Sequence, residues 1–278
     1  PGLGFGHRRL AIIDLVGGVQ PFVSGSRDGV LTFNGEIYNY TELADELRGN
    51  GANLRTRSDT EVLTEGLARD GAQYISRLRG MFAFGFWDAR AQTLTLSRDR
   101  LGERPLYYAE TTDGFLIFAS ELGAIIASGL VSLDFDHQAL ADYFLYGFIP
   151  DPKSVYKAIR KLPPATALIA KRGEAARLQR YWSLEYSPLE EVSFETAQDE
   201  LIARLDDAVL SQMIADVPLG AFLSGGVDSS GVVASMAETG VTVKTCSIGF
   251  DEDSHDERQY ARLVAKLFRT DHVEDVAT

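Results

Sequence analysis

The stretch Phe222-Leu223-Ser224-Gly225-Gly226-Val227-Asp228-Ser229-Ser230 decides the fold of the second half of the chain. Apolar residues at 217–221 precede it and predict a buried strand. A helical pattern follows at 231–238, and residues 241–248 predict a second strand. Strand, glycine-rich turn, helix and strand form the unit from which parallel sheets are built. Ligands bind such sheets at the carboxyl ends of the strands, where this turn lies.

The residues of this turn suit a bound anion. Gly225 and Gly226 lack Cβ atoms, so the backbone can approach a ligand closely. The N–H groups and the dipole of a helix start favour negative charge, and the serines of the stretch add hydroxyl donors. Asp228 would repel a bare phosphate but suits a phosphate that carries Mg²⁺. The alternative is an ordinary glycine-rich turn in which Asp228 or Ser229 caps the helix. The stretch is not a Walker A loop, because the chain contains no Gly-Lys-Ser/Thr sequence.

Composition excludes several classes of protein. A chain of 278 residues with 45% hydrophobic residues predicts two folded domains, and a net charge of −13 argues against a nucleic-acid partner. The single cysteine permits no intrachain disulfide, and the sequence has no apolar run of membrane-spanning length. We therefore expect a cytoplasmic protein that binds neither nucleic acid nor membrane. A homodimer is left open.

The pattern of the first half predicts an α+β domain with two β-rich layers and helices outside them. A helix is expected over 41–47, and another follows residue 58. The predicted strands cover 4–14, 30–33, 81–87, 93–97, 106–109, 115–119, 166–169 and 177–182. We place the first domain at 1–183, a polar linker at 184–193 and the second domain at 194–278. The second domain should begin with a long helix over 194–213.

Two local patterns in the first half have simple structural explanations. Asn34-Gly35 follows a predicted strand, and Asn-Gly is the strongest short signal for a hairpin turn. Ser58-Asp59-Thr60-Glu61 has the pattern of a capping box. Ser58 would then accept the N–H of Glu61, Glu61 would reach back, and Asp59 would lie in the first turn of the helix.

Together these motifs resemble a known family. The loop at 224–230 is similar to the pyrophosphate-binding loop of the ATP pyrophosphatases. The whole chain resembles the glutamine-hydrolysing asparagine synthetases through further stretches at 7–12, 34–39, 58–62, 79–84, 98–102 and 119–121. The resemblance implies an αββα fold of the N-terminal nucleophile hydrolase type for the first domain. It implies an incomplete parallel-sheet ATP-pyrophosphatase domain for the second.

The resemblance also implies a glutaminase site in the first domain. In that family an N-terminal cysteine attacks the glutamine side-chain amide, with its own α-amine as base. Arg9 would hold the glutamine α-carboxylate and Asp59 its α-amino group. The Asn34 side chain and the Gly35 N–H would form the oxyanion hole, and Glu36 would also contact glutamine. The alternatives are an ion pair for Arg9, a helix cap for Asp59 and a hairpin turn at Asn34-Gly35.

The chain departs from the family at the nucleophile. Its one cysteine, Cys246, lies on the second predicted strand of the synthetase half and is expected to be a small buried hydrophobe. The nucleophilic cysteine is absent from this chain, as is the family's downstream Ser-Gly-Glu stretch. We therefore expect segments to be missing before Pro1 and after Thr278, and the chain alone to be inactive.

For the second domain the resemblance implies an adenylation site that binds ATP and Mg²⁺. Ammonia from the first site would displace AMP from an adenylated carboxylate, normally that of aspartate. Asp228 would bind Mg²⁺ through the pyrophosphate, and Ile248 would contact adenine. The acidic run at 251–257 follows on the ligand side, with a solvated loop as its alternative. The residues implied for ATP binding are Leu223, Ser224, Gly225, Gly226, Asp228, Ser229, Ser230 and Ile248.

Three hypotheses follow. The first is an ATP-dependent, glutamine-hydrolysing amidotransferase that forms asparagine, AMP and pyrophosphate. The second is an adenylating ligase that uses ammonia or an intramolecular amine, as β-lactam synthetases do, with an inactive glutaminase half. The third is a truncated, non-enzymatic protein that binds glutamine or ATP, which turnover with ammonia would exclude. Relatives that amidate sugars or peptides share these motifs, so the acceptor of the first hypothesis stays open.

Overall fold

The computed structural model describes residues 2–186, 192–250 and 256–277. The chain divides into two compact units, Pro1–Glu185 and Tyr186–Thr278, hereafter the first and second units. The division falls inside the linker expected at 184–193. Residues 187–191 of that linker and residues 251–255 of the acidic run lie outside the described residues.

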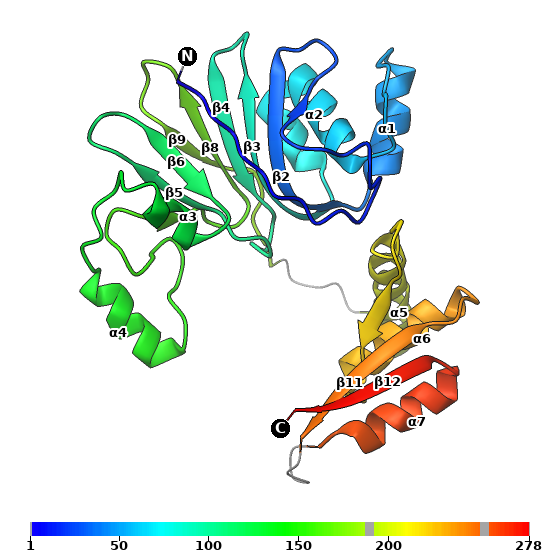
Figure 1. The fold of residues 1–278 in the computed structure, drawn as a ribbon. Helices are drawn as coiled ribbons and strands as arrows, with labels where there is room; N and C mark the ends of the chain where they lie inside the picture. Colours follow the sequence, from blue (N-terminus) through cyan, green and yellow to red (C-terminus); the bar gives the residue numbers. More distant parts are fainter. Residues whose placement is uncertain (1, 187–191, 251–255, 278) are drawn as a thin grey trace. The chain divides into compact units, whose positions relative to one another are not determined.

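The first unit contains two antiparallel sheets (Figure 1). The larger sheet has the order β1-β2-β3-β4-β8-β9 and the smaller one the order β6-β5-β7. The strands of the larger sheet are β1 Phe22–Val23, β2 Gly29–Ile37, β3 Gly80–Asp88, β4 Thr93–Arg98, β8 Thr166–Lys171 and β9 Arg177–Arg180. Those of the smaller sheet are β5 Tyr107–Glu110, β6 Leu116–Ala119 and β7 Arg160–Lys161.

Strand alternation explains how the layers of the first unit pack. Phe82, Phe84 and Phe86 of β3 point to the core beneath α1 (Tyr40–Gly49) and α2 (Asp59–Asp70), which lie on one face of the larger sheet. Ala83 belongs to the core between the two sheets. Gly85 faces that core too, because a Cβ added there would lie 2.6 Å from the ring of Phe118.

Helix α3 (Leu122–Ala127) packs on the outer face of the smaller sheet through Ile125. The order of layers is therefore helix, sheet, sheet, helix. The αββα arrangement implied by the sequence is confirmed. A short 3₁₀ helix, Gly71–Arg77, follows α2, and α4 (His137–Tyr146) lies beyond α3 in the chain.

Two local predictions in the first unit are wrong. Residues 4–14 form no strand, because the chain turns back at 13–18, where main-chain carbonyls accept hydrogen bonds from Arg9. Asn34-Gly35 is not a hairpin turn, because both residues lie inside β2, opposite Ala83 and Phe82 of β3.

The capping box is half right. Ser58 caps α2, but it accepts the N–H of Thr60 at 3.2 Å rather than that of Glu61. Glu61 does not reach back to Ser58. Its carboxylate instead accepts the main-chain N–H groups of Arg55 and Thr56, at 2.8 and 2.6 Å. Glu61 thus links the segment before α2 to the helix, and it does not act as a cap beside Asp59.

The second unit contains a parallel sheet of order β10-β11-β12, as the sequence predicts. Its strands are β10 Gly220–Phe222, β11 Lys244–Phe250 and β12 Asp271–Ala277. Its helices are α5 Phe194–Ser211, α6 Val227–Glu238 and α7 Arg258–Phe268. The strand predicted at 217–221 begins only at Gly220, since Pro218 has no N–H for the ladder. It is mostly exposed, so the prediction of a buried strand is wrong. Among the described residues, no helix is long and apolar enough to cross a membrane.

Candidate functional site

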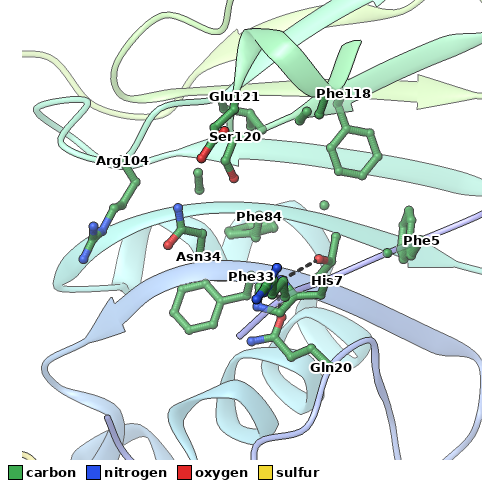
Figure 2. Close-up of a pocket in the computed structure, with 18 of the residues that line it drawn as sticks. Phe5, His7, Gln20, Phe33, Asn34, Phe84, Arg104, Phe118, Ser120 and Glu121 are labelled. Carbon is green, nitrogen blue, oxygen red and sulfur yellow. Dashed lines mark hydrogen bonds between the residues drawn. The ribbon is translucent and has the colours of Figure 1, made fainter. Parts of the chain in front are cut away.

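A cavity of about 790 Å³ opens in the first unit beside the larger sheet. The start of the chain, β2, β3, the first turn of α2 and the segment around β6 line it (Figure 2). All five residues to which the sequence assigned glutamine binding lie on its wall. They are Arg9, Asn34, Gly35, Glu36 and Asp59.

Asp59 is the first residue of α2 and is almost fully buried, with 3% of its surface exposed. Its Oδ2 accepts the main-chain N–H of Ile37 at 3.1 Å, and its Oδ1 accepts the hydroxyl of Ser58 at 3.3 Å. Burial raises the pKa of Asp59 to about 6, although these hydrogen bonds and nearby Arg9 oppose the rise. Asp59 is thus a buried carboxyl whose charge a cationic ligand would stabilise.

Glu36 lies on β2 next to this carboxyl. Burial, and then the charge of Asp59, raise the pKa of Glu36 to about 7, while Arg9 and Arg104 oppose the rise. Its Oε2 is buried and has no hydrogen-bond partner among the described residues. The cavity therefore contains two neighbouring carboxyl groups, one of which has an acceptor oxygen that the described residues leave unpartnered.

Arg9 provides positive charge at the same wall. Its Nη1 donates to the carbonyl of Asp14 at 3.0 Å and its Nη2 to that of Ile13 at 2.5 Å. The guanidinium lies over Gly18, where a Cβ would overlap Nη2. These hydrogen bonds go to main-chain carbonyls rather than to a carboxylate, so the ion-pair alternative is wrong for the described residues. They fix the guanidinium while leaving part of its fork free.

Asn34 and Gly35 occupy the stretch of β2 that faces β3. Gly35 has φ +149°, and a Cβ there would overlap the carbonyl oxygen of Met81. Only glycine fits where the two strands approach so closely. The Asn34 side chain and the main chain of Gly35 both line the cavity, as two candidate hydrogen-bond donors must.

The assignment from the sequence missed two further cavity residues. His7 lies in the chain start and contacts the hydroxyl of Thr32 through Nδ1 at 3.2 Å, the hydrogen bond drawn in Figure 2. Burial, and then Arg9, lower the pKa of His7 below its ordinary value. Arg104 reaches the cavity from the loop after β4. Both residues stand in or near matching motifs, but no local pattern shows that they line one cavity.

In the second unit, the glycine-rich stretch forms a tight loop between β10 and α6. Gly225 has φ +85°, and a Cβ there would lie 2.5 Å from the main-chain nitrogen of Ala261 in α7. The Ser224 and Ser229 hydroxyls lie 3.0 Å apart, and Ser224 Oγ accepts the N–H of Gly226 at 3.2 Å. The loop is thus closed by its own serines and packed against α7.

Gly226 is the N-cap of α6, so the alternative in which Asp228 or Ser229 caps this helix is wrong. Asp228 stands exposed in the first turn, and the Ser230 N–H bonds the carbonyl of Gly226 at 3.0 Å. A helix N-terminus with an exposed carboxylate beside it fits a polyphosphate bound through Mg²⁺.

The remaining predicted nucleotide residues lie at the carboxyl ends of β10 and β11. Leu223 is buried and donates its N–H to the carbonyl of Cys246 at 2.9 Å. Ile248 lies two residues further along β11 with 58% of its surface exposed, so its side chain is available to a ligand. Cys246 itself is half-buried rather than buried, because no helix covers its face of the sheet in the described part of the chain.

Comparison with known proteins defines the class. Residues 1–182 match the glutamine amidotransferase domain family, and residues 200–278 match the asparagine synthase family. The chain belongs to the glutamine amidotransferase domain family. Its similarity to the glutamine-hydrolysing asparagine synthetases extends over almost its whole length, which confirms the resemblance found in the sequence.

Three relatives illustrate this. Asparagine synthetase [glutamine-hydrolyzing] 1 of Bacillus subtilis is 34% identical over 99% of this chain and 43% of its own length. A putative asparagine synthetase of Methanocaldococcus jannaschii is 37% identical over 97% of this chain and 55% of its own length. Amidase chyE of Penicillium rubens is 33% identical over 97% of this chain and 42% of its own length. The chain thus spans about half the length of these proteins.

Solved structures are more distant. A structure described as that of the allosteric regulatory enzyme of purine biosynthesis is 16% identical, with a TM-score of 0.47, over 98% of this chain and 75% of its own. A likeness at that level carries no functional argument.

Proposed function

We propose that the chain is part of a glutamine-dependent amidotransferase that amidates an adenylated carboxylate. Glutamine is hydrolysed in the first unit, and the carboxylate is activated with ATP in the second. Aspartate is the acceptor, so the products are asparagine, glutamate, AMP and pyrophosphate. The use of ATP and glutamine fits a cytoplasmic protein.

One observation carries this proposal: a fixed guanidinium, a buried carboxyl and a half-buried carboxyl line one cavity. Arg9 supplies positive charge, Asp59 and Glu36 supply acceptors, and Oε2 of Glu36 has no hydrogen-bond partner among the described residues. That arrangement complements a free α-amino acid, which carries one group of each charge. Binding would satisfy the buried groups that the protein leaves incomplete.

The roles within the first unit follow from these positions. Asp59 and Glu36 receive the α-ammonium group of glutamine, and the free N–H groups of Arg9 receive its α-carboxylate. The Asn34 side chain and the Gly35 N–H stabilise the oxyanion that forms when the side-chain amide is attacked. We assign the attack to a cysteine thiol other than that of Cys246, which belongs to the second unit.

The roles within the second unit follow from the loop after β10. Main-chain N–H groups at the start of α6, with Ser224, Ser229 and Ser230, hold the phosphates of ATP. Asp228 binds Mg²⁺ on the pyrophosphate side. The Gly225 and Gly226 backbone allows close approach, and Leu223 and Ile248 bound the adenine. Bound ATP activates the acceptor carboxylate by adenylation, after which ammonia displaces AMP.

A second candidate differs only in the acceptor. One relative of nearly equal identity is named an amidase rather than an asparagine synthetase. A carboxylate other than that of aspartate is therefore the alternative substrate for the same two sites.

The test uses the protein expressed from its complete reading frame. It is incubated with glutamine, Mg-ATP and a panel of carboxylates that begins with aspartate, and AMP, glutamate and amide products are measured by mass spectrometry. Asparagine and AMP in equal amounts are expected. AMP formed only with another carboxylate would select the second candidate, and absence of AMP with every acceptor would contradict the proposal.

A further inference from the structure

The loop after β4 is built to hold its main chain in one position. Asp99 at its start is buried, with 1% of its surface exposed. Its carboxylate accepts four main-chain N–H groups, at 3.0 to 3.2 Å. The donors are Phe82, Leu101, Glu103 and Arg104. The loop is therefore fixed to β3 as well as to itself.

Arg98 fixes the same loop from the carbonyl side. Its guanidinium is buried and donates to the carbonyls of Gly102 and Arg104, at 2.6 and 2.8 Å. Its Nη1 pairs with the carboxylate of Asp151 at 2.9 Å. The N–H and the carbonyl of Arg104 are thus both bonded, and the loop directs its side chain to the cavity that Glu36 lines.

The side chain of Arg104 itself is not used up by the loop. Its Nε is buried and has no hydrogen-bond partner among the described residues, and the same holds for Oε2 of Glu36. A buried donor and a buried acceptor of opposite charge therefore line one cavity, each with unsatisfied capacity. Such groups are costly in a folded protein unless a ligand completes them.

Three elements bring charge to Glu36. Helix α2 contributes Asp59, which favours the neutral carboxyl, as burial does. The chain start contributes Arg9 and the loop after β4 contributes Arg104, and both favour the carboxylate. Part of the Arg9 fork is already bonded to main-chain carbonyls, whereas Arg104 retains its buried Nε–H. The other titratable groups near Glu36 or on the cavity wall are His7, Arg8, Tyr38 and Glu121.

We propose that Arg104 is a positioning residue for Glu36: it holds this carboxylate ionised and oriented to receive the α-ammonium group of glutamine. This inference rests on the proposed glutamine site and adds to it a residue from another loop. Arg104 acts through its charge on the carboxylate that receives the α-ammonium group and not on the reacting amide. It acts on substrate affinity rather than on the chemical step.

The experiment measures kcat and KM for glutamine hydrolysis from pH 6 to 9 with the protein from the complete reading frame. The variants are Arg104→Gln, which removes the charge, and Arg104→Lys, which keeps it. Arg90→Gln is the matched control, since Arg90 is 77% exposed at the turn between β3 and β4 and does not line the cavity. Dissociation constants for glutamine over the same pH range supply a second readout.

The direction of the change in KM follows from the positive charge that Arg104→Gln removes. Without Arg104, the pKa of Glu36 rises further, because one of the two cations that oppose its rise is lost. Arg104→Gln should then raise KM about fivefold over wild type at pH 7. That ratio should fall to nearly one by pH 9, with kcat little changed. Arg104→Lys and Arg90→Gln should stay within about twofold.

The ratio of variant to wild-type KM across pH tests the inference. A ratio of KM values that is the same at every pH would mean a merely structural role and would overturn the inference. So would equal loss in Arg104→Lys and Arg104→Gln, or no change in either. If Arg104→Gln does not fold, the Arg104→Lys ratio across pH serves as the test, and wild-type behaviour is expected. A wild-type protein that neither hydrolyses nor binds glutamine would instead contradict the proposed function itself.

Discussion

The carboxylate of Asp59 accepts the main-chain N–H of Ile37 at 3.1 Å, which ties the first residue of α2 to the last residue of β2. This bond brings Asp59 beside Glu36, one residue earlier on the strand. A helix start and a strand end, more than twenty positions apart in the chain, thereby form one anionic wall. The site depends on this junction more than on either element alone.

The buried charge of Asp59 should lower the stability of the fold above pH 6. Its folded pKa, about 6, lies above the value of 3.8 expected for an unfolded aspartate. The folded chain therefore holds a proton that the unfolded chain has lost between about pH 4 and 6. The free energy of unfolding falls as pH rises through this window and stays lower above it.

Asp59→Asn should remove this penalty and weaken the substrate site. Urea denaturation near pH 7.5 should show a gain of at most about 3 kcal/mol, which disappears near pH 4. KM for glutamine should rise about tenfold or more, since a charged hydrogen bond is lost. Asp45→Asn, on the exposed face of α1, is the control and should change neither. A loss of stability in Asp59→Asn at pH 7.5 would contradict this account.

Gly35→Ala should destabilise the first unit strongly. The added Cβ would overlap the Met81 carbonyl at φ +149°, so β2 and β3 must separate where the cavity is built. We expect a loss of about 3 kcal/mol or more in urea denaturation. Gly123→Ala in α3, where a Cβ meets nothing within 4 Å, should change stability by less than about 1 kcal/mol. Similar stabilities for the two variants would show that the strand approach is not tight.

Asp228→Asn should lower AMP formation and leave glutamine hydrolysis nearly unchanged. Asp228 is exposed in the first turn of α6, so the fold should be retained. AMP formation should fall about 100-fold, because the Mg²⁺ site is lost. Glutamine hydrolysis should change little. Glu238→Gln, at the other end of α6, is the control for removing a charge from this helix. Equal AMP formation in Asp228→Asn and Glu238→Gln would contradict the assignment of Asp228 to the nucleotide site.

Most of the residues that the family resemblance assigned to the two sites lie on or beside regular elements. Asn34 to Glu36 lie on a strand, Asp59 begins a helix, and the loop at 224–230 joins a strand to a helix. The local pattern predicted the backbone at Asp59 and at 224–230, whereas at Asn34-Gly35 it predicted a hairpin turn instead of a strand. The pattern predicted two β-rich layers with helices outside, and the resemblance implied the αββα arrangement. In β3, the phenylalanines face α1 and α2, and Ala83 and Gly85 face the second sheet.

The parts that could not be predicted depend on contacts between distant segments. Residues 4–14 have the composition of a strand, but Arg9 bonds carbonyls at 13–15 and the chain turns instead. The sequence at Asn34-Gly35 predicts a turn, but in the structure this glycine allows β3 to approach β2 closely. Arg104 reaches the cavity only because Asp99 and Arg98 fix its loop, which no spacing in the sequence reveals.

The central claim is that one nitrogen atom passes from the first unit to a carboxylate activated in the second. It is tested most directly with amide-¹⁵N glutamine, Mg-ATP and aspartate, in complete-reading-frame proteins carrying Asn34→Ala or Asp228→Asn. Wild type should give ¹⁵N-asparagine. Asn34→Ala should cut that labelled product about 100-fold but still form asparagine from added ammonium, whereas Asp228→Asn should form little from either donor. Unlabelled asparagine from the wild type would contradict the claim. So would an Asn34→Ala variant in which asparagine formation falls equally with glutamine and with ammonium as the donor.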